Sequence, residues 1–543
     1  MVFPSMLTSD FSKELATYTH SRQVKSFVLV PLVLAMLSTT ALASSQPDSV
    51  FTQQKHFQDS LHSLPIAGNF RFHADHVLGT SLDVVIHTER ESDARRAYAA
   101  IVAEIHRLDS ILSVWRFDSE ISQLNAKGRH SASPELFAVI AACEQWRSKT
   151  CGAFDTRLGQ LIRHWEQHSG VMTIEEPIRQ ALLDQLSQTT VTLDADSQTI
   201  QLPEGILLTP DAYAKGYIID KALVSARTAV PALKGLLVDI GGDLRVWGQA
   251  PQQRSWQIGV RDAFSRADND SASQVLALTN QAVAFSGQGA RSLAGNSHLL
   301  NPQDGLPLNQ VEQCVVVGQC AAHVDALATA LAAMPPLDGM ALIEQLAGYE
   351  AQMILTNGQR FQSTGWSTLV QSGQQAHSVT VAGDMPTTVS GPNGVWPAGF
   401  QARLELSIPK IAVEKYRAPY VSVWVTDAQK KRIRTLAVWG KADKWIDSNY
   451  IWWKRYGRQM DSLDSIARPS RQPGQYTLNW DGKDDNGQPV PAGNYLIHIE
   501  TSREHGEHSY QSFELTTQPG APAQELPAKA EIAGLRLSFV RSI

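Results

Sequence analysis

The hydrophobic pattern of the chain changes once, within residues 365–395, and this change limits the fold more than any other feature. Before it, segments with the alternation of a strand follow segments with the periodicity of a helix. After it, short strand-like runs are separated only by turn residues. We therefore expect a mixed α+β domain over residues 66–364, a linker and first strand over 365–395, and an all-β sandwich over 396–543.

Secondary structure in the first part follows from local pattern. Residues 81–87 alternate as a strand does, and Ser92 is the expected N-cap of the next helix. Ser133 and Pro134 stand in the order of a cap followed by a first-turn proline, so a helix is expected over 134–149. The remaining expected strands lie near 189–202, 236–240, 256–260, 275–285 and 314–317, and the remaining expected helices near 321–334 and 337–347. This mixed order favours an α+β domain over a doubly wound parallel sheet.

Strand signals in the last part recur at short, regular intervals, as in a β-sandwich. The expected strands cover residues 403–408, 420–426, 433–439, 476–480, 495–501 and 510–515. Trp452 and Trp453 would point to opposite faces of a further strand, which would expose one of them as a partner contact.

One strongly apolar stretch lies near the start of the chain. It follows Arg22 and Lys25, is interrupted by Pro31, and ends in the small residues Ala41-Leu42-Ala43. Length and ending are typical of a secretory signal rather than of a membrane span, so residues 1–43 are expected to be a signal peptide. The chain is then an exported protein, expected in the bacterial periplasm. The alternative is a chain anchored to the inner membrane by this N-terminal segment.

Charge excludes one class of partner. The chain has 47 Lys and Arg against 53 Asp and Glu, a formal charge of −6. A protein that binds the phosphate backbone of nucleic acid normally carries a basic surface. We therefore expect no nucleic-acid partner.

Single motifs suggest a cation site and an anion site. Asp325 and Thr329 are four residues apart on an expected helix, so both side-chain oxygens leave from one face. Two protein oxygens suit Mg²⁺, which keeps waters and substrate phosphates in its shell. Lys215 precedes Gly216 at the start of another expected helix and could meet an anion there. The alternatives are a solvated or capping pair for Asp325 and Thr329, and a surface position for Lys215.

Seven blocks of sequence, taken in order, carry a family resemblance. They read LDSILSVWRFDSEISQLN (108–125), GAFDTRLGQLIRHW (152–165), AYAKGYIIDKA (212–222), GLLVDIGGDLRVWG (235–248), AFSGQGARS (284–292), SHLLNPQDGLPL (297–308) and VDALATALAAM (324–334). Block by block they resemble the ApbE family of FAD:protein FMN transferases. The resemblance covers residues 66–360.

The resemblance implies an activity and a metal site. Such enzymes cleave FAD, join its FMN part to a Thr or Ser hydroxyl of a target protein through a phosphoester, and release AMP. It implies that Mg²⁺ is held by Asp325, Thr329 and the backbone carbonyl of Ala212. It also implies that Lys215 meets the diphosphate or the adenine side of FAD. Lys215 and Asp325 are accordingly expected to be catalytic.

The resemblance also implies FAD contacts and a base. Positions matching the family's FAD-binding segments are Leu78, Trp115, Ala153, Phe154, Asp155, Thr209 and Leu299. Phe154 would be available for stacking. His298 is the expected general base for the acceptor hydroxyl, since imidazole titrates near neutral pH. The alternative role for His298 is a hydrogen bond to the phosphate or support of its loop.

Several of these positions depart from the family pattern. Leu78 stands for a common methionine and Trp115 for a tyrosine, and both changes keep an apolar or aromatic side chain. Thr209 and Asn301 replace carboxylates, with Asp211 near enough in sequence to compensate for Thr209. Polarity of the FAD pocket is therefore the property that these departures affect.

The C-terminal region resembles an uncharacterised domain that occurs with ApbE-type enzymes. Its segment 480–495 is also similar to the immunoglobulin-like module of flagellar hook-capping proteins. We expect this domain to dock a partner, with an exported or membrane-bound acceptor protein as the enzyme's target. Two alternatives to flavin transfer remain open: hydrolysis of FAD to FMN and AMP, and a non-catalytic periplasmic flavin-binding or adaptor protein.

Overall fold

The computed structural model describes most of the chain after residue 67. The described residues are 68–168, 174–251, 255–264, 267, 269, 272–288, 292–293, 296–297, 299–371, 394–411, 418–440, 448–457, 467–468, 471, 473–485, 487–503 and 506–542. The expected signal peptide and His298 lie outside them. None of the helices in these ranges combines the length and the apolar character needed to cross a membrane.

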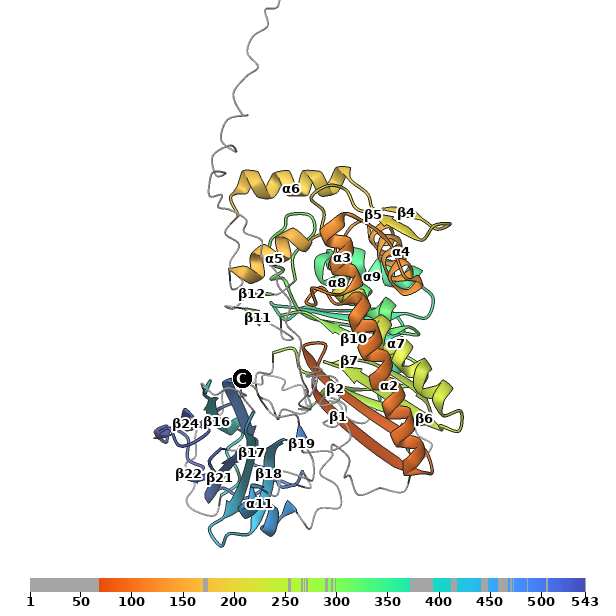
Figure 1. Ribbon diagram of the computed structural model, residues 1–543. Helices are drawn as coiled ribbons and strands as arrows, with labels where there is room; N and C mark the ends of the chain where they lie inside the picture. Colours follow the sequence, from red (N-terminus) through yellow and green to blue (C-terminus); the bar gives the residue numbers. More distant parts are fainter. Residues whose placement is uncertain are drawn as a thin grey trace, which may run out of the picture. The chain divides into compact units, whose positions relative to one another are not determined.

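Residues 68–371 mix helices and strands (Figure 1). The helices are α2 (Glu91–Leu112), α3 (Glu120–Lys127), α4 (Pro134–Lys149), α5 (Gly159–Gln167), α6 (Glu176–Gln188), α7 (Asp211–Ala229), α8 (Ala321–Ala333), α9 (Pro336–Gln345) and α10 (Trp366–Leu369). The strands are β1 (Asn69–Val77), β2 (Thr80–His87), β3 (Arg129–Ser131), β4 (Thr192–Asp194), β5 (Thr199–Gln201), β6 (Gly235–Ile240), β7 (Asp243–Gly248), β8 (Trp256–Arg261), β9 (Ala272–Leu278), β10 (Ala282–Ser286), β11 (Ser292–Leu293), β12 (Asn296–Ser297), β13 (Val311–Gly318), β14 (Glu350–Leu355) and β15 (Arg360–Gln362).

An eight-stranded sheet forms the centre of this domain, in the order β1-β2-β6-β7-β10-β13-β14-β15. Every neighbouring pair is antiparallel. One face carries a core shared with α2, α4, α7 and α8, and α2 lies beside α7 along it (Figure 1). The other face, over β7, β10 and β13, is covered by the β8–β9 hairpin and by Trp366 of α10. The expected α+β class is therefore confirmed.

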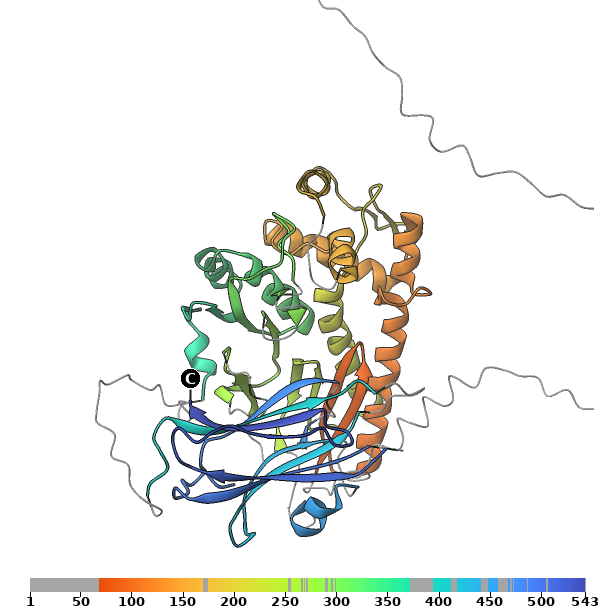
Figure 2. The ribbon, with the colours of Figure 1, turned by 90° about the vertical axis from the view of Figure 1, so that its left-hand side faces the viewer.

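Residues 394–542 form the all-β part (Figure 2). Its elements are β16 (Phe400–Ile408), β17 (Tyr420–Asp427), β18 (Arg432–Trp439), α11 (Tyr450–Arg455), β19 (Ala467–Arg468), β20 (Gly474–Trp480), β21 (Asn494–Ser502), β22 (Ser509–Thr516), β23 (Gln524–Leu526) and β24 (Gly534–Arg541). A four-stranded sheet, β20-β16-β24-β23, and a five-stranded sheet, β19-β18-β17-β21-β22, share one hydrophobic core. The outer face of the five-stranded sheet carries a second cluster that includes Trp452 of α11.

Two local expectations were wrong. Ser92 is not the N-cap of α2, because the helix begins at Glu91 with Arg90 at the cap position. Trp452 and Trp453 lie in α11 and not in a strand. The stretch expected as linker begins with α10, whose Trp366 is buried, and its residues 372–393 lie outside the described part of the chain.

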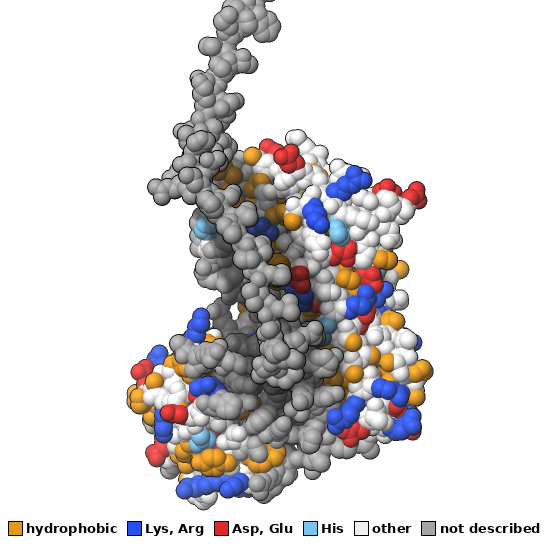
Figure 3. All heavy atoms as spheres, viewed as in Figure 1, with side chains coloured by type: hydrophobic (Ala, Val, Ile, Leu, Met, Phe, Trp, Pro, Cys, Tyr) orange, Lys and Arg blue, Asp and Glu red, His pale blue; other side chains and the backbone are white. Residues whose placement is uncertain are grey.

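Charged side chains of both signs are interspersed over the face of the molecule shown in Figure 3. Many are paired with a neighbour on the same helix, such as Arg95 with Glu91 and Arg107 with Glu104. Such exposed pairs contribute little stability, about 0–1 kcal/mol each. The charges that bear on function are the buried ones described next.

Candidate active site

Helices α7 and α8 come into direct contact at Gly216. A methyl group in place of the Gly216 hydrogen would lie 2.3 Å from the carbonyl oxygen of Ala321 and 2.6 Å from the nitrogen of Ala322. Real β-carbons do not approach backbone atoms so closely, so only glycine allows this contact. The first turn of α8 therefore lies against the second turn of α7.

Asp325 uses this contact to reach the backbone of α7. Its Oδ2 accepts a hydrogen bond from the Gly216 N–H at 3.1 Å, and the residue is 4% exposed. In an ideal helix that N–H would be donated to the carbonyl of Ala212, four residues earlier. Asp325 therefore binds an N–H group that an ideal helix would direct at Ala212, the other expected metal ligand at this contact.

The charged groups that act on Asp325 are one lysine and two further carboxylates. Burial raises the pKa of Asp325 to about 7, against the opposing effect of Lys215, while Asp243 and Asp211 raise it further. Carboxylates thus outnumber the lysine at this point. A bound cation would remove the excess negative charge, which is the arrangement expected of a site that binds a metal ion.

Lys215 is half-buried and is held by a buried partner. Its ammonium forms an ion pair with Oδ2 of Asp243, which is buried at the start of β7. The other oxygen of Asp243, Oδ1, accepts the Phe285 N–H at 2.9 Å. Sequence analysis missed Asp243 as a site residue. The signal that could have found it is a carboxylate directly after paired glycines at the end of a buried strand.

The donors on α7 and α8 fit Mg²⁺. They are a carboxylate oxygen, the hydroxyl of the partly exposed Thr329 one turn along α8, and the backbone carbonyl of Ala212. All are hard oxygen donors, and Mg²⁺ is usually held by one or two carboxylates with waters and substrate phosphates. Among the described residues there is no cluster of three or more His, Cys, Asp and Glu side chains arranged for a metal.

Leu78 lies at the same end of the sheet as Asp243. Leu78 and Gly79 form the turn between β1 and β2, with φ values of 50° and 75°. Gly241, in the turn between β6 and β7, packs so closely on Thr80 that a β-carbon there would lie 2.7 Å from the threonine side chain. The structure thus brings Leu78 to the end of the sheet at which Asp243 lies.

The segment Ala153-Phe154-Asp155, called the wall below, is buried. Phe154 is 1% exposed and belongs to the hydrophobic core, so its ring is not available for stacking on a ligand as expected. The Asp155 carboxylate binds the guanidinium of Arg157 at 2.6 Å and is not free either. Thr209, on the next segment, donates its N–H to the Thr156 carbonyl at 2.8 Å. The structure therefore places Thr209 directly beside this wall.

Trp115 is exposed to solvent, whereas the segment that follows His298 is partly packed against the core. Trp115 is 73% exposed, on the loop between α2 and α3, so its ring is free to stack on a ligand. Leu299 is partly buried against the core. Asn301 closes a turn, because its Oδ1 accepts the Gln303 N–H at 3.0 Å and its Nδ2 donates to Asp304 at 3.1 Å. An amide performs this turn role without a carboxylate.

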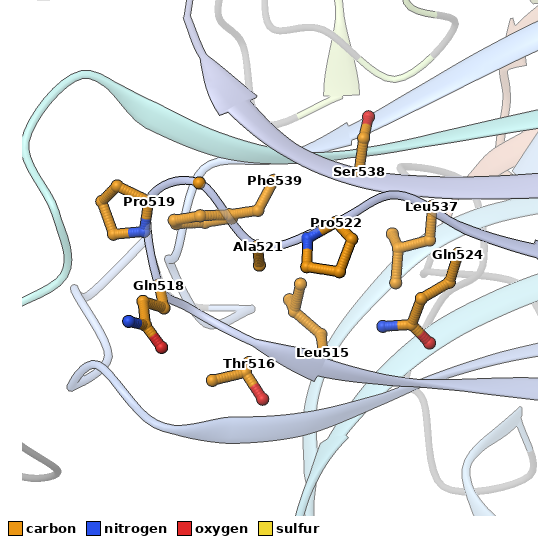
Figure 4. Close-up of a pocket in the computed structure, with 11 residues that line it drawn as sticks. Leu515, Thr516, Gln518, Pro519, Ala521, Pro522, Gln524, Leu537, Ser538 and Phe539 are labelled. Carbon is orange, nitrogen blue, oxygen red and sulfur yellow. The ribbon is translucent and has the colours of Figure 1, made fainter.

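A pocket of about 400 Å³ lies in the C-terminal domain and is lined by none of these residues (Figure 4). Leu515, Pro519, Pro522, Leu537 and Phe539 line it, together with uncharged polar side chains. Nothing in this lining neutralises a phosphate or moves a proton. The chemistry therefore belongs to α7, α8 and β7.

Comparisons with known proteins divide the chain at the same place as the fold. The sequence profile of the ApbE family matches residues 78–353. That of a family described as "Predicted periplasmic protein (DUF2271)" matches residues 401–533. An FAD:protein FMN transferase of Chlamydia muridarum is 27% identical over 256 residues, 44% of this chain and 76% of that protein. One from Rhodobacter capsulatus is 27% identical over 275 residues, 47% of this chain and 50% of that protein.

A solved structure shares the fold of the first domain. The crystal structure of the ApbE protein of Thermotoga maritima is 24% identical and has a TM-score of 0.51. It covers 56% of this chain and 99% of the other. This likeness concerns the fold alone, and it agrees with the helix and strand arrangement of residues 68–371.

Proposed function

The chain belongs to the ApbE family, and on that premise we propose that it is an Mg²⁺-dependent FAD:protein FMN transferase. The observation that carries the proposal is the contact between α7 and α8. It joins Asp325 to the Gly216 N–H of α7, the helix that also carries Ala212. The same helix carries Lys215, which forms an ion pair with Asp243. Relatives that are 27% identical are named for this activity.

The residues of the site have separate tasks. Asp325, Thr329 and the Ala212 carbonyl hold the metal ion. Lys215 offsets the negative charge of Asp243 and Asp325, which would otherwise repel the pyrophosphate of FAD. When bound, Mg²⁺ neutralises phosphate charge and orients the pyrophosphate for in-line displacement.

The reaction balances as a phosphoryl transfer. The hydroxyl oxygen of a Thr or Ser on the acceptor protein attacks the phosphorus on the FMN side of the FAD pyrophosphate. A new P–O bond forms to the acceptor, and the bond from that phosphorus to the bridging oxygen breaks. AMP leaves with the bridging oxygen. The hydroxyl proton passes to His298, the proposed base, which lies outside the described residues.

The FAD molecule is bound by residues around this centre. Trp115 offers an exposed ring for the flavin, and Leu78 lies at the end of the sheet that carries Asp243. Ala153, Asp155, Thr209 and Leu299 form the walls, with Phe154 behind them in the core. Asp155 also supports this segment through its ion pair with Arg157.

The C-terminal domain supports a location for the chain and a kind of acceptor protein. Its match to a family described as predicted periplasmic supports export of the chain, and residues 1–43 are the proposed signal. The acceptor is then an exported or membrane-bound protein. The sandwich docks that partner.

One experiment tests the activity. Mature protein is incubated with FAD, Mg²⁺ and a periplasmic extract, then examined for flavin fluorescence on a denatured protein band and for AMP. We expect both products. Asp325→Ala abolishes both, whereas Asp338→Ala, which removes an exposed first-turn carboxylate of α9, leaves both unchanged.

The outcomes separate the candidate functions. FMN and AMP without a labelled band identify FAD hydrolysis as the activity. Tight FAD binding with no AMP contradicts both enzymatic functions and identifies a flavin-binding protein. Turnover by Asp325→Ala at the wild-type rate contradicts the metal assignment.

A further inference from the structure

Asp220 is a buried carboxylate whose hydrogen bonds lead directly to the helix that carries Asp325. It lies on α7, one turn after Gly216. Its Oδ1 accepts the Ala321 N–H at 3.0 Å, and its Oδ2 accepts the Ala322 N–H at 3.1 Å. Both donors are the first residues of α8, so Asp220 meets two of the N–H groups that a helix leaves unsatisfied at its start.

Helix α8 has no cap of its own. Its N-cap residue is Cys320, whose side chain makes no capping bond to α8, and the first turn contains no acidic residue. The Cys320 thiol instead donates to Asp220 Oδ2 at 2.9 Å. Asp220 therefore caps α8 from the neighbouring helix, and its negative charge stabilises the positive end of the α8 dipole.

Two carboxylates thus join α7 and α8, and each reaches from its own helix to the backbone of the other. Asp220 of α7 takes the first N–H groups of α8, and Asp325 of α8 takes the Gly216 N–H of α7. Gly216 lies between them, where the helix backbones are closest. A shift of α8 along α7 would break both sets of bonds together, so the position of the Asp325 carboxylate depends on Asp220.

Strand β7 of the central sheet also contacts α7, at Asp220 and at Lys215. Arg245 of β7 donates to Asp220 Oδ1 at 2.6 Å, and Asp243, two residues earlier on the same face of β7, binds Lys215. Helix α7 is therefore joined to β7 by two ion pairs. In one the acidic residue lies on α7, and in the other it lies on β7. Asp220 has a partner on α8 and another on the sheet, which fixes its own side chain.

We propose that Asp220, supported by Arg245, is the positioning residue that sets the geometry of the metal site formed by Asp325, Thr329 and Ala212. It touches neither metal nor substrate. The proposal rests on the metal assignment made above. Loss of such an outer partner of a metal ligand typically lowers metal affinity by about 10–100-fold.

Direct metal binding tests the proposal without using turnover. Mn²⁺ is titrated into the full mature chain and followed by loss of the free-ion electron paramagnetic resonance signal, with Mg²⁺ as competitor. Asp220→Asn keeps the size of the side chain but loses its charge and presents an amide to two N–H donors. We expect its Mn²⁺ dissociation constant to rise by about 10–100-fold.

The matched control is Asp93→Asn. Asp93 is also buried, lies in the first turn of α2, and binds Arg90 at 2.9 Å and Arg96 at 3.1 Å. Its loss reduces stability in the same domain but leaves Mn²⁺ affinity unchanged.

Arg245→Met is the second variant, since it leaves both α8 N–H bonds of Asp220 in place. We expect a smaller loss of Mn²⁺ affinity than in Asp220→Asn.

The outcomes distinguish this proposal from the one on which it rests. A wild-type chain that binds no Mn²⁺ when Mn²⁺ is the only metal present, or whose bound Mn²⁺ is not displaced by Mg²⁺, overturns the metal assignment. Wild-type affinity in Asp220→Asn, or an equal loss in Asp93→Asn, overturns the positioning role alone. Should Asp220→Asn fail to fold, an unchanged affinity in Arg245→Met overturns it as well.

Discussion

Gly216 is the residue on which the whole candidate site depends, because it sets the separation of α7 and α8. Replacing it by alanine would put a methyl group 2.3 Å from the Ala321 carbonyl oxygen, a backbone atom that cannot move without the helix. We expect Gly216→Ala to lower the free energy of unfolding by about 1–3 kcal/mol. Mn²⁺ affinity should fall as well, since Asp325 loses its contact with α7.

Gly339 provides the comparison for this change. It also lies inside a helix, α9, but a β-carbon there would meet the flexible end of Leu331 at 2.9 Å. Gly339→Ala should therefore have little effect on unfolding or on Mn²⁺ binding. Chemical denaturation and the same metal titration measure both variants. Gly216→Ala with wild-type affinity would show that close helix packing is not required for the site.

His498 makes the stability of the C-terminal domain depend on pH. It is buried between Thr426, 2.9 Å from its Nε2, and Tyr510, 2.6 Å from its Nδ1, and its ring stacks on Trp424. Burial lowers its pKa from 6.5 to about 4, with Arg455 and Lys430 adding to the shift. Between these values the unfolded chain binds a proton that the folded chain does not.

Stability should therefore be complete above pH 6.5 and fall as the pH is lowered toward 4, by up to about 1.4 kcal/mol per pH unit. His498→Gln, which keeps hydrogen-bonding groups but does not titrate, should lose this slope. His106→Gln, an exposed histidine on α2, should keep it. Urea denaturation across the window measures the slopes, and an unchanged slope in His498→Gln would contradict the assignment.

At the scale of elements, local pattern predicted α2, α4, α7, α8 and α9 of the first domain but not α3, α5 or α6. It also missed the strands β1, β7, β14 and β15 of the central sheet. The expected helix over 134–149 coincides with α4, and Ser133 caps it through the Leu136 N–H as expected. Short apolar runs were less informative. Residues 450–455 resemble a strand in composition but form α11, because a run of that length has no periodicity that separates helix from strand.

Side-chain roles that join distant elements could not be predicted. Asp325 and Thr329 were found because four-residue spacing on a helix is visible in the sequence. The bond from Gly216 to Asp325 spans 109 residues and that from Ala321 to Asp220 spans 101, and no local pattern records either. The family resemblance gave the proposed metal ligands, but it gave neither Asp220, which accepts the first N–H groups of α8, nor Asp243, which binds Lys215.

Helix α11 depends on one buried carboxylate of the sheet beneath it. Glu500 of β21, 0% exposed, accepts the Ile451 N–H at 2.9 Å and the Trp452 N–H at 2.8 Å. His508 lies 2.8 Å from it on the neighbouring chain segment. Glu500→Gln replaces an acceptor by an amide that faces these donors, so we expect a loss of about 2 kcal/mol in the C-terminal domain.

Hydrogen exchange of the α11 amides measures this change locally, and denaturation measures it for the domain. Glu514→Gln on β22, an exposed position, is the control and should change neither. Equal protection of α11 in Glu500→Gln and in the wild-type chain would show that packing of Trp452 alone holds the helix.

At the scale of the whole molecule, the described residues contain two separate sets of hydrophobic cores. One set belongs to residues 68–371 and contains α7, α8 and β7 of the candidate site. The other belongs to residues 394–542 and contains Trp452 and Trp480. No residue belongs to both sets, so each part buries its own apolar surface and meets the main requirement for folding as a unit.

This division predicts how ligands change thermal unfolding. Under the proposed function, FAD with Mg²⁺ binds only the folded first domain, and at about 100 times the dissociation constant it should add about 2.7 kcal/mol to the stability of that domain. We expect calorimetry to show two transitions, of which one rises by about 5 °C. Glu500→Gln should lower only the other, and Asp325→Ala should abolish the rise caused by the ligands. A single transition that moves as a whole with ligand and with Glu500→Gln would contradict independent domains.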